Sequence, residues 1–340
     1  RAQTGGLRVL GAEARPQSTW LRVEPQRGSG AAWLEVWVNG EQLMPWTFRV
    51  DHYAISGPPP ALPSGPVAAD SVLPIVNRWL DWWERNDRWS GTIGIAHRDV
   101  PAMIRPIGLA DRARGVPNAV DTRFHTGSSS KMLTAVALLQ LVQDGRVSLD
   151  DPISKYLPDY PNADIARRVT LRHLLTHTAG LGGLFELPKF EGKRRYGSNA
   201  AYLPVLADRA LLFEPGARYS YSNEGFLLAG AVVERATGKS FDAVLAERIL
   251  TPARMSGWCD CMGTPTAPRR AFGYSYREDE DPLGIGPLTD NEYFIFAEGI
   301  AAGGYYATAE DYLRFAHAMR RGLLLDSAHT HLAFTKSPQS

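Results

Sequence analysis

The sequence predicts an α+β fold, in which strand-like segments and a mostly helical region share one large domain, and a small partial β-rich segment precedes them. Three observations predict it. Apolar and polar residues alternate as in strands over residues 1–55 and again around 90–109, whereas residues 128–247 have mostly helical periodicity. A Pro/Gly-rich stretch at residues 56–66 separates the first alternating region from the rest. With 340 residues, the chain is long enough for one large domain and an appendage.

Residues 1–55 are predicted to form a small, partial antiparallel sheet. Turn residues such as Asn39-Gly40 separate short segments of period-two apolarity, which cover residues 7–10, 20–24, 33–38 and 46–50. So few strands need a partner surface to be stable. We therefore expect this segment to be the tail of a domain that starts before Arg1. Because the chain begins without methionine or a signal-peptide pattern, we also expect a processed or excised form.

A linker is expected over residues 56–66. Its prolines and glycines cannot join a ladder or a helix interior, so the segment should run extended and semi-rigid. It is the predicted boundary between the N-terminal β-rich segment and one large domain of residues 67–340.

The elements after the linker follow from periodicity and capping. A helix with an aromatic face is predicted over residues 67–88, because apolar side chains recur there at three- and four-residue spacing. A hairpin follows, and its two strands cover residues 90–96 and 102–109. A last helix is predicted over residues 309–321, with Thr308 as N-cap and Asp311 completing a capping box.

Composition and charge exclude some classes of partner. The formal net charge of +1 gives no reason to expect nucleic acid or an acidic surface as a partner. No apolar run approaches the ~18 residues that a membrane-spanning helix needs. We therefore expect no membrane span.

The two cysteines, Cys259 and Cys261, are separated by a single residue. This spacing looks too tight for an easy mutual disulfide, given the Cα separation that such a bond requires. We therefore predict two ordinary thiols. No cluster of cysteine or histidine accompanies them, so a metal site is not expected, and the compartment cannot be inferred from cysteine usage.

Ser128 and Lys131 lie one helical turn apart at the start of an apolar helical run. Residues i and i+3 share a helix face, so the lysine amine can come within hydrogen-bond reach of the serine hydroxyl. An amine kept neutral by burial can take the proton of that hydroxyl and make it a nucleophile. The alternative is an N-cap serine followed by a solvated lysine, and the spacing alone does not exclude it.

Tyr221 and Asn223 form a second candidate pair, on a loop between the Pro215-Gly216 turn and the next apolar helix. A buried tyrosine beside a lysine ammonium can carry protons to and from a serine and a leaving group. The asparagine amide can donate to a substrate carbonyl while its oxygen orients the lysine. The alternative is that Tyr221 belongs to the core and that Asn223 caps the helix.

Five segments of the chain together resemble the serine β-lactamase-like superfamily, in its branch of class C β-lactamases, esterases and D-aminopeptidases. They follow one another in the order typical of that superfamily and cover residues 124–131, 141–152, 171–181, 215–225 and 301–311. The resemblance implies a β-lactamase-like fold for residues 67–340, in which an antiparallel sheet is flanked by helices and accompanied by a helical subdomain.

The resemblance also implies roles for the candidate residues. Ser128 would be the acylated nucleophile and Lys131 its base or base partner. Tyr221 and Asn223 would be the tyrosine and the asparagine of a Tyr-x-Asn motif, the latter binding substrate. The implied function is a serine hydrolase that forms an acyl-enzyme with a small-molecule ester, amide (D-amino-acid peptides included) or β-lactam.

The resemblance implies no cofactor and no metal. It makes His173 and His177 structural residues of a helix that precedes a glycine turn, not ligands of an ion. Members of the superfamily are often exported, which favours a periplasmic or secreted location, although the sequence itself does not fix the compartment.

One landmark of the superfamily is missing. A Lys-Thr-Gly or His-x-Gly triplet on a strand should follow residues 301–311 and supply the second backbone N–H of the oxyanion hole. Residues 329–331 imitate it faintly, without glycine or strand context. We therefore expect a domain that is truncated at its C-terminus, or an oligomer in which a neighbouring chain supplies the strands. The alternative function is a catalytically impaired or inactive binding or scaffold protein of the same fold.

Overall fold

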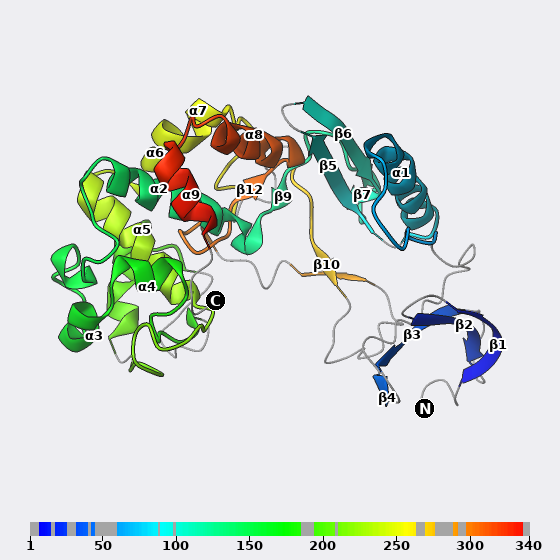
Figure 1. The fold of residues 1–340 in the computed structure, drawn as a ribbon, viewed down its shortest axis with the longest axis horizontal. Coiled ribbons are helices and arrows are strands. Elements are labelled where there is room, and N and C mark those ends of the chain that lie inside the picture. The colour runs from blue at the N-terminus through cyan, green and yellow to red at the C-terminus, as the bar shows by residue number, and fades with distance from the viewer. Residues whose placement is uncertain are drawn as a thin grey trace. The chain divides into compact units, whose positions relative to one another are not determined.

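The structure is a computed structural model, and its helices and strands are drawn in Figure 1. It divides into two compact units. Unit 1 comprises Arg1–Gly91, Pro106–Ala119 and Phe272–Tyr293, and unit 2 comprises Thr92–Arg105, Val120–Ala271 and Phe294–Ser340. The residues that the structure describes are 7–14, 18–25, 32–39, 42–44, 60–87, 89–97, 100–184, 194–207, 210–262, 269–275, 288–291 and 297–335.

Unit 1 contains a four-stranded antiparallel sheet in the order β1-β2-β3-β4. Its strands are β1 (Leu7–Ala14), β2 (Ser18–Pro25), β3 (Ala32–Asn39) and β4 (Gln42–Met44). Val9 pairs with Val23, and Leu21 pairs with Leu34, as expected when strands of matching alternation form one sheet. Three of the four predicted strands are therefore confirmed, whereas the predicted strand at residues 46–50 lies outside the described residues.

The helix predicted after the linker is α1 (Ala69–Arg85), and Leu80 and Trp82 are its buried residues. Its aromatic side chains pack against one another, with the rings of Trp79 and Trp83 5.7 Å apart in an edge-to-face arrangement. The other elements of unit 1 are short strand pairs: β7 (Leu109–Asp111) with β8 (Val116–Pro117), and β10 (Tyr274–Ser275) with β11 (Thr289–Asp290).

Unit 2 contains the predicted hairpin, β5 (Gly91–His97) and β6 (Val100–Ile107), although the first residue of β5 and the last two of β6 are assigned to unit 1. A second, very short pair joins distant parts of the chain. β9 (Phe124–His125) pairs antiparallel with β12 (Tyr306–Ala307), so the segment just before Ser128 lies beside the segment just before the last helices. The predicted α+β class is confirmed.

The helical part of unit 2 is built around α2 (Lys131–Gln143), which is apolar almost all round and contacts α5, α6 and α9. The other helices are α3 (Ala163–Arg168), α4 (Leu171–Leu175), α5 (Asn223–Thr237), α6 (Phe241–Leu245), α7 (Thr251–Ala253), α8 (Ala309–Arg320) and α9 (Ser327–Phe334), joined by the 3-10 turns η1 (Gly127–Ser130), η2 (Ile153–Lys155) and η4 (Ala200–Leu206) and the π-helical turn η5 (Ala246–Leu250). α8 starts with the predicted capping box of Thr308 and Asp311.

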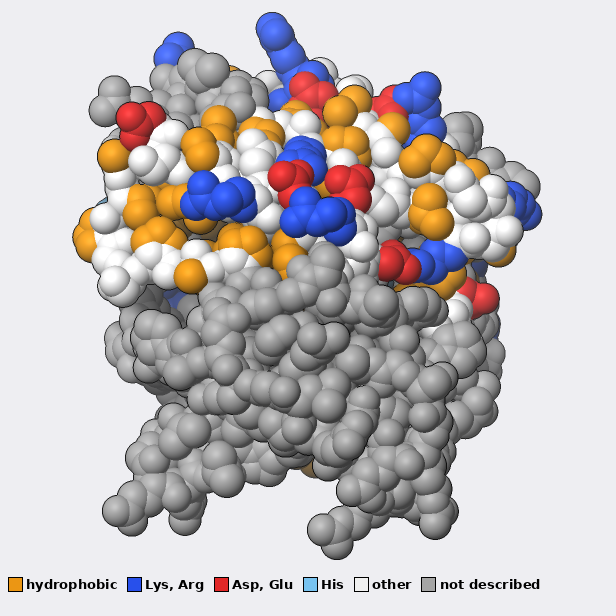
Figure 2. All heavy atoms as spheres, turned by 90° about the vertical axis from the view of Figure 1, so that its right-hand side faces the viewer, with side chains coloured by type: hydrophobic (Ala, Val, Ile, Leu, Met, Phe, Trp, Pro, Cys, Tyr) orange, Lys and Arg blue, Asp and Glu red, His pale blue; other side chains and the backbone are white. Residues whose placement is uncertain are grey.

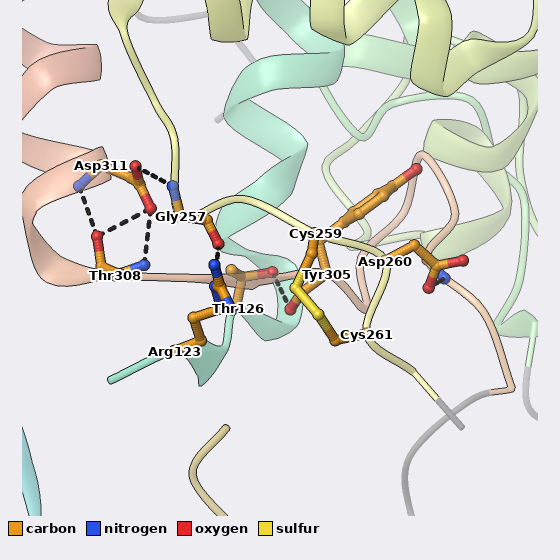
Figure 3. Close-up of a disulfide and its surroundings, with 10 residues drawn as sticks. Arg123, Thr126, Gly257, Cys259, Asp260, Cys261, Tyr305, Thr308 and Asp311 are labelled. Carbon is orange, nitrogen blue, oxygen red and sulfur yellow. Dashed lines mark hydrogen bonds between the residues drawn. A yellow bond between two sulfur atoms is a disulfide. The ribbon is translucent and has the colours of Figure 1, made fainter. Parts of the chain in front are cut away.

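Cys259 and Cys261 form a disulfide, so the prediction of two free thiols is wrong (Figure 3). The backbone is strand-like there, because the N–H and the C=O of Cys259 both bond to the backbone of Tyr306, each at 2.9 Å. Residues i and i+2 of an extended chain point to the same side. The two Cα atoms are 5.3 Å apart, within the range that disulfides occupy.

The described surface is mixed in charge. On the face drawn in Figure 2, lysine and arginine side chains lie next to aspartate and glutamate, with hydrophobic side chains between them. Within the described ranges, no helix is both long and apolar enough to cross a bilayer.

Candidate active site

The site begins at the turn η1, which presents Ser128 at the surface and leads directly into α2. Gly127 has a φ of +52°, a left-handed conformation that turns the strand β9 into the helix. Gly303 packs against this turn so closely that a Cβ there would lie 2.7 Å from the Gly127 carbonyl oxygen. The close contact of Gly303 with Gly127 therefore holds the turn that presents Ser128 in place.

Lys131 is buried at the start of α2, with 6% of its surface exposed, and its amine has three oxygen neighbours. Nζ lies 3.1 Å from Ser128 Oγ and 2.7 Å from Asn223 Oδ1, and it also donates to the carbonyl oxygen of Ala302. That carbonyl is held in place because its neighbour Ala301 accepts a hydrogen bond from Thr134 Oγ1 at 2.7 Å. The alternative of a solvated lysine is therefore wrong.

Burial lowers the pKa of Lys131 to about 8. None of its three oxygen neighbours is a carboxylate, so the ammonium has no paired charge there to offset the loss of hydration. Near physiological pH, an appreciable fraction of the molecules therefore carries Lys131 with a neutral amine. In the neutral form, the oxygens of Asn223 and Ala302 can accept hydrogen bonds from the two N–H groups of the amine. The lone pair of the nitrogen is then available to accept the proton of the Ser128 hydroxyl.

The side chains of Tyr221, Ser222 and Asn223 point alternately to opposite sides of the chain. Ser222 is extended, with φ −137° and ψ 122°, so the side chains on either side of it point the opposite way. The Ser222 hydroxyl turns inward as the N-cap of α5, accepting the N–H of Gly225 at 3.1 Å and donating to the carbonyl of Gly182 at 3.1 Å. Tyr221 and Asn223 are thereby left facing Ser128 and Lys131, and Ser222, not Asn223, caps the helix.

The hydroxyl of Tyr221 donates to Ser128 Oγ at 2.7 Å. We expected a buried tyrosine, but Tyr221 is 46% exposed, so neither burial nor membership of the core describes it. The ring centroid lies 5.1 Å from Lys131 Nζ.

The structure brings all four predicted residues together: Lys131 and Tyr221 contact Ser128 Oγ, and Asn223 contacts the amine of Lys131. Ser128 Oγ lies within hydrogen-bond reach of a lysine of lowered pKa and of a phenol, and it faces solvent. Such an arrangement can remove a proton from a hydroxyl and return one to a leaving group. Among the described residues, no group of three or more His, Cys, Asp or Glu side chains could hold a metal ion.

The third landmark is not found in the described C-terminal residues. After β12, residues 308–335 contain the helices α8 and α9 and no strand. Residues 329–331, which imitate the triplet faintly, lie within α9. This part of unit 2 therefore provides no second strand opposite Tyr221.

Two residues that hold the site were not predicted to do so. Ser222 could have been recognised, since a serine before an apolar helical run is a typical N-cap. His177 had been interpreted as a structural residue of the 171–181 segment, yet its ring lies against Tyr221 with the centroids 4.5 Å apart. No sequence pattern indicates that contact, because the two residues are 44 positions apart in the chain.

Comparison with known proteins bears on both the fold and the site. A family model described as Beta-lactamase matches residues 82–339. Among solved structures, the penicillin-binding protein from Bacillus halodurans superposes with a TM-score of 0.64 at 31% identity, covering 74% of this chain and 77% of that one. The β-lactamase-like fold that the sequence predicts is confirmed.

Two curated relatives are similar over about 70% of this chain. Esterase EstB of Burkholderia gladioli is 34% identical over 269 residues, which cover 69% of this chain and 67% of that protein. The putative penicillin-binding protein PbpX of Bacillus subtilis is 27% identical over 257 residues, which cover 74% of this chain but only 60% of PbpX. Since the family model includes the segments that carry Ser128, Lys131, Tyr221 and Asn223, the chain belongs to the β-lactamase family.

Proposed function

We propose that this protein is a serine hydrolase that forms an acyl-enzyme at Ser128. One observation carries the proposal: Ser128 is exposed, and its Oγ lies 3.1 Å from the amine of Lys131 and 2.7 Å from the hydroxyl of Tyr221. A serine that merely capped a helix would need neither neighbour.

In the acylation step, Ser128 Oγ attacks the substrate carbonyl while its proton passes to the neutral amine of Lys131. The new C–O bond produces a tetrahedral intermediate, whose oxyanion the Ser128 backbone N–H stabilises. When the intermediate collapses, the bond to the leaving group breaks. Tyr221 donates its proton to the leaving group, and the Lys131 ammonium returns a proton to the phenolate.

Deacylation reverses these transfers with water in place of the leaving group. The neutral amine of Lys131 takes one proton from the water, by way of Tyr221, while the water oxygen attacks the acyl carbonyl. When the intermediate collapses, the bond to Ser128 Oγ breaks, the proton returns to Ser128 Oγ, and the acid is released. Asn223 keeps its oxygen on the lysine at 2.7 Å, and its amide N–H₂ can donate to the substrate carbonyl.

The proposed substrate is a small-molecule acyl compound: an ester first, then an amide or a β-lactam. The ester is placed first because the relative with 34% identity is named an esterase. A solvent-exposed nucleophile is also compatible with a small activated ester.

Covalent labelling with a fluorophosphonate tests the proposal directly. We expect one equivalent of phosphonate per chain, on the peptide that contains Ser128. Ser128→Ala should abolish labelling, whereas Ser129→Ala, which changes the adjacent exposed serine, should retain it. Labelling of the Ser128→Ala variant, or none of the wild type, would refute the proposed function.

A second candidate function is a binding or scaffold protein of low activity. The specific observation in its favour is that the described residues 308–335 offer only helices where a second oxyanion donor would be needed. Retained binding of an acyl compound without covalent labelling would support it. A site completed by a neighbouring chain would instead make labelling depend on protein concentration.

We also propose that the protein works in the periplasm or outside the cell. The disulfide between Cys259 and Cys261 supports this location, because disulfides are rare in the reducing cytosol. Cells treated with a thiol-alkylating reagent before lysis should yield protein with both cysteines unmodified. Full alkylation would place the protein in a reducing compartment.

A further inference from the structure

His177 follows Thr176, the C-cap of α4, and has a left-handed backbone with a φ of +57°. Its backbone carbonyl accepts the N–H of Ser220 at 2.8 Å, so the loop that carries Tyr221 is attached to this residue. A left-handed backbone is tolerated by histidine, asparagine and glycine better than by most residues. His177 therefore has a left-handed backbone conformation and also a backbone hydrogen bond to the loop that carries Tyr221.

The imidazole ring contacts the Tyr221 loop in two ways. Nδ1 accepts the backbone N–H of Ser222 at 3.1 Å. The ring lies against the ring of Tyr221, with centroids 4.5 Å apart and planes 31° apart, and against Phe226 on α5 at 5.0 Å. Ser222 is thus held by its N–H as well as by its hydroxyl, at the one residue between Tyr221 and Asn223.

This geometry requires a neutral ring. Because Nδ1 accepts a hydrogen bond, the proton of the neutral imidazole is on Nε2. A second proton would have to go on Nδ1, where it would face the Ser222 N–H and remove the bond. Burial and the nearby charge of Lys131 both act against that proton and lower the pKa of His177 to about 4.

We propose that His177 is a positioning residue of this active site: it holds Ser222 by its Nδ1 and the Tyr221 ring by stacking, and so keeps Tyr221 and Asn223 at Ser128 and Lys131. The inference rests on the proposed function, since it assigns His177 a part in the acylation of Ser128. His177 does not touch the reacting atoms. Its effect is on the placement of the phenol and the amide.

Two substitutions of His177 distinguish the effect of losing the hydrogen-bond acceptor from the effect of disturbing the left-handed backbone. His177→Asn retains an acceptor, Oδ1, near the place of Nδ1, and His177→Gly removes the acceptor, while both residues tolerate a positive φ. We would measure fluorophosphonate labelling as a maximal rate, kinact, and an apparent binding constant, KI. Thermal unfolding of both variants shows whether each is folded at the assay temperature.

We expect His177→Gly to lower kinact by roughly 10²-fold, the effect of displacing catalytic groups by about 1 Å, with KI unchanged. His177→Asn should recover most of the loss. Equal kinact values for the two variants would overturn the role of the acceptor, and a loss confined to KI would overturn positioning altogether. If the glycine variant fails to fold, a kinact for the asparagine variant tenfold or more below that of wild type overturns the assignment.

His173→Asn is the matched control. This histidine belongs to the same segment, and its Nδ1 accepts a backbone N–H, that of Thr170 at 3.2 Å, but it caps α4 and does not contact the Tyr221 ring. Its kinact should equal that of wild type. A loss similar to that of His177→Gly would mean that any disturbance of α4 impairs the site.

Nitrogen-15 NMR of the imidazole gives a readout that does not depend on activity. At pH 6 we expect His177 to be neutral, with a proton on Nε2 and none on Nδ1. A proton on Nδ1, or a titration midpoint near 6.5, would overturn the inference. Absence of labelling in wild type would refute the proposed function instead, and the NMR result would then decide the contact with Ser222 separately.

Discussion

At the scale of single residues, Lys131 combines a buried position with three uncharged oxygen neighbours. An ordinary lysine would be almost wholly protonated at neutral pH, and its ammonium could not take a proton from serine. Burial brings the pKa to about 8, so the neutral form is accessible. The environment of the amine, more than its distance from Ser128, therefore decides whether it can act as a base.

The first prediction concerns this amine. Lys131→Ala should reduce the labelling rate of Ser128 by roughly 10²-fold or more, with an unchanged circular dichroism spectrum. In wild type the rate should rise with pH through about 8, because deprotonation creates the base. Lys239→Ala, which removes an exposed lysine paired with Glu247, is the control. Equal labelling of Lys131→Ala and wild type would exclude the lysine as base.

The second prediction concerns the phenol. Tyr221→Phe removes only the hydroxyl that donates to Ser128 at 2.7 Å, and we expect the acylation rate to fall by roughly 10²–10⁴-fold. Tyr219→Phe is a suitable comparison, because Tyr219 is also exposed and also contacts the ring of His177. A loss below about tenfold for Tyr221→Phe would assign this tyrosine to packing.

At the scale of elements, the site consists of three pieces of chain: the turn η1 with the start of α2, the loop before α5, and the turn at residues 300–304. The last is closed by paired hydrogen bonds between Ile300 and Gly303, at 2.8 and 2.9 Å. It brings the Ala302 carbonyl to Lys131 and places Gly303 against Gly127. The fit of these turns leaves no room for a side chain at residue 303.

The third prediction follows from that fit. Gly303→Ala puts a Cβ 2.7 Å from the Gly127 carbonyl oxygen at a φ of +150°, so we expect a loss of roughly 1–3 kcal/mol in the free energy of unfolding and slower labelling. Gly145→Ala, at a φ of +69° but with open space around it, introduces an alanine at positive φ without a steric clash. Chemical denaturation of both variants checks the difference. Equal losses would mean that contact with η1 is unimportant.

The sequence predicted elements better than contacts between them. Periodicity and capping placed α1, α8 and the β5–β6 hairpin within a few residues, since those signals depend on neighbours in the chain. They carry no information about the pairing of β9 with β12, which joins residues some 180 positions apart. The disulfide was missed for a related reason, because the extended backbone of Cys259 depends on Tyr306.

The candidate site was predicted in composition but only partly in geometry. The spacing of Ser128 and Lys131 indicated their contact, and the resemblance to a known family supplied Tyr221 and Asn223. The exposure of Tyr221 and the support from His177 could not be predicted, because both depend on which loop packs on which turn. Residues that act at a distance from the reacting atoms leave no motif of their own.

At the scale of the whole molecule, the fourth prediction concerns the proposed linker. Limited proteolysis of the native protein should cut first between residues 56 and 66, because an extended Pro/Gly-rich backbone makes few contacts. The two fragments, identified by mass spectrometry, would then separate the N-terminal strands from residues 67–340. A first cut between residues 128 and 247 would contradict the proposed domain division.

The fifth prediction concerns turnover. Loss of one oxyanion donor costs roughly 10²–10³-fold in kcat. With helices, not a strand, over residues 308–335, we expect p-nitrophenyl acetate to give a burst of about one equivalent and then turnover on the order of 0.1 s⁻¹ or less. A dilute monomer with fast turnover would contradict this. Turnover that rises with protein concentration would indicate a strand from a second copy.

The contact between Lys131 and the carbonyl of Ala302 also has a consequence for the timing of synthesis. The two residues are 171 positions apart, so a ribosome working at 5–20 residues per second needs roughly ten to thirty seconds to add the second after the first. Until the segment around Ala302 has folded, the burial of Lys131 is incomplete, so we expect its pKa to stay nearer that of an ordinary lysine and its amine to be a poorer base for Ser128. In a nascent chain we therefore expect Ser128 to become reactive only after the segment around Ala302 has been synthesised and has folded against Lys131.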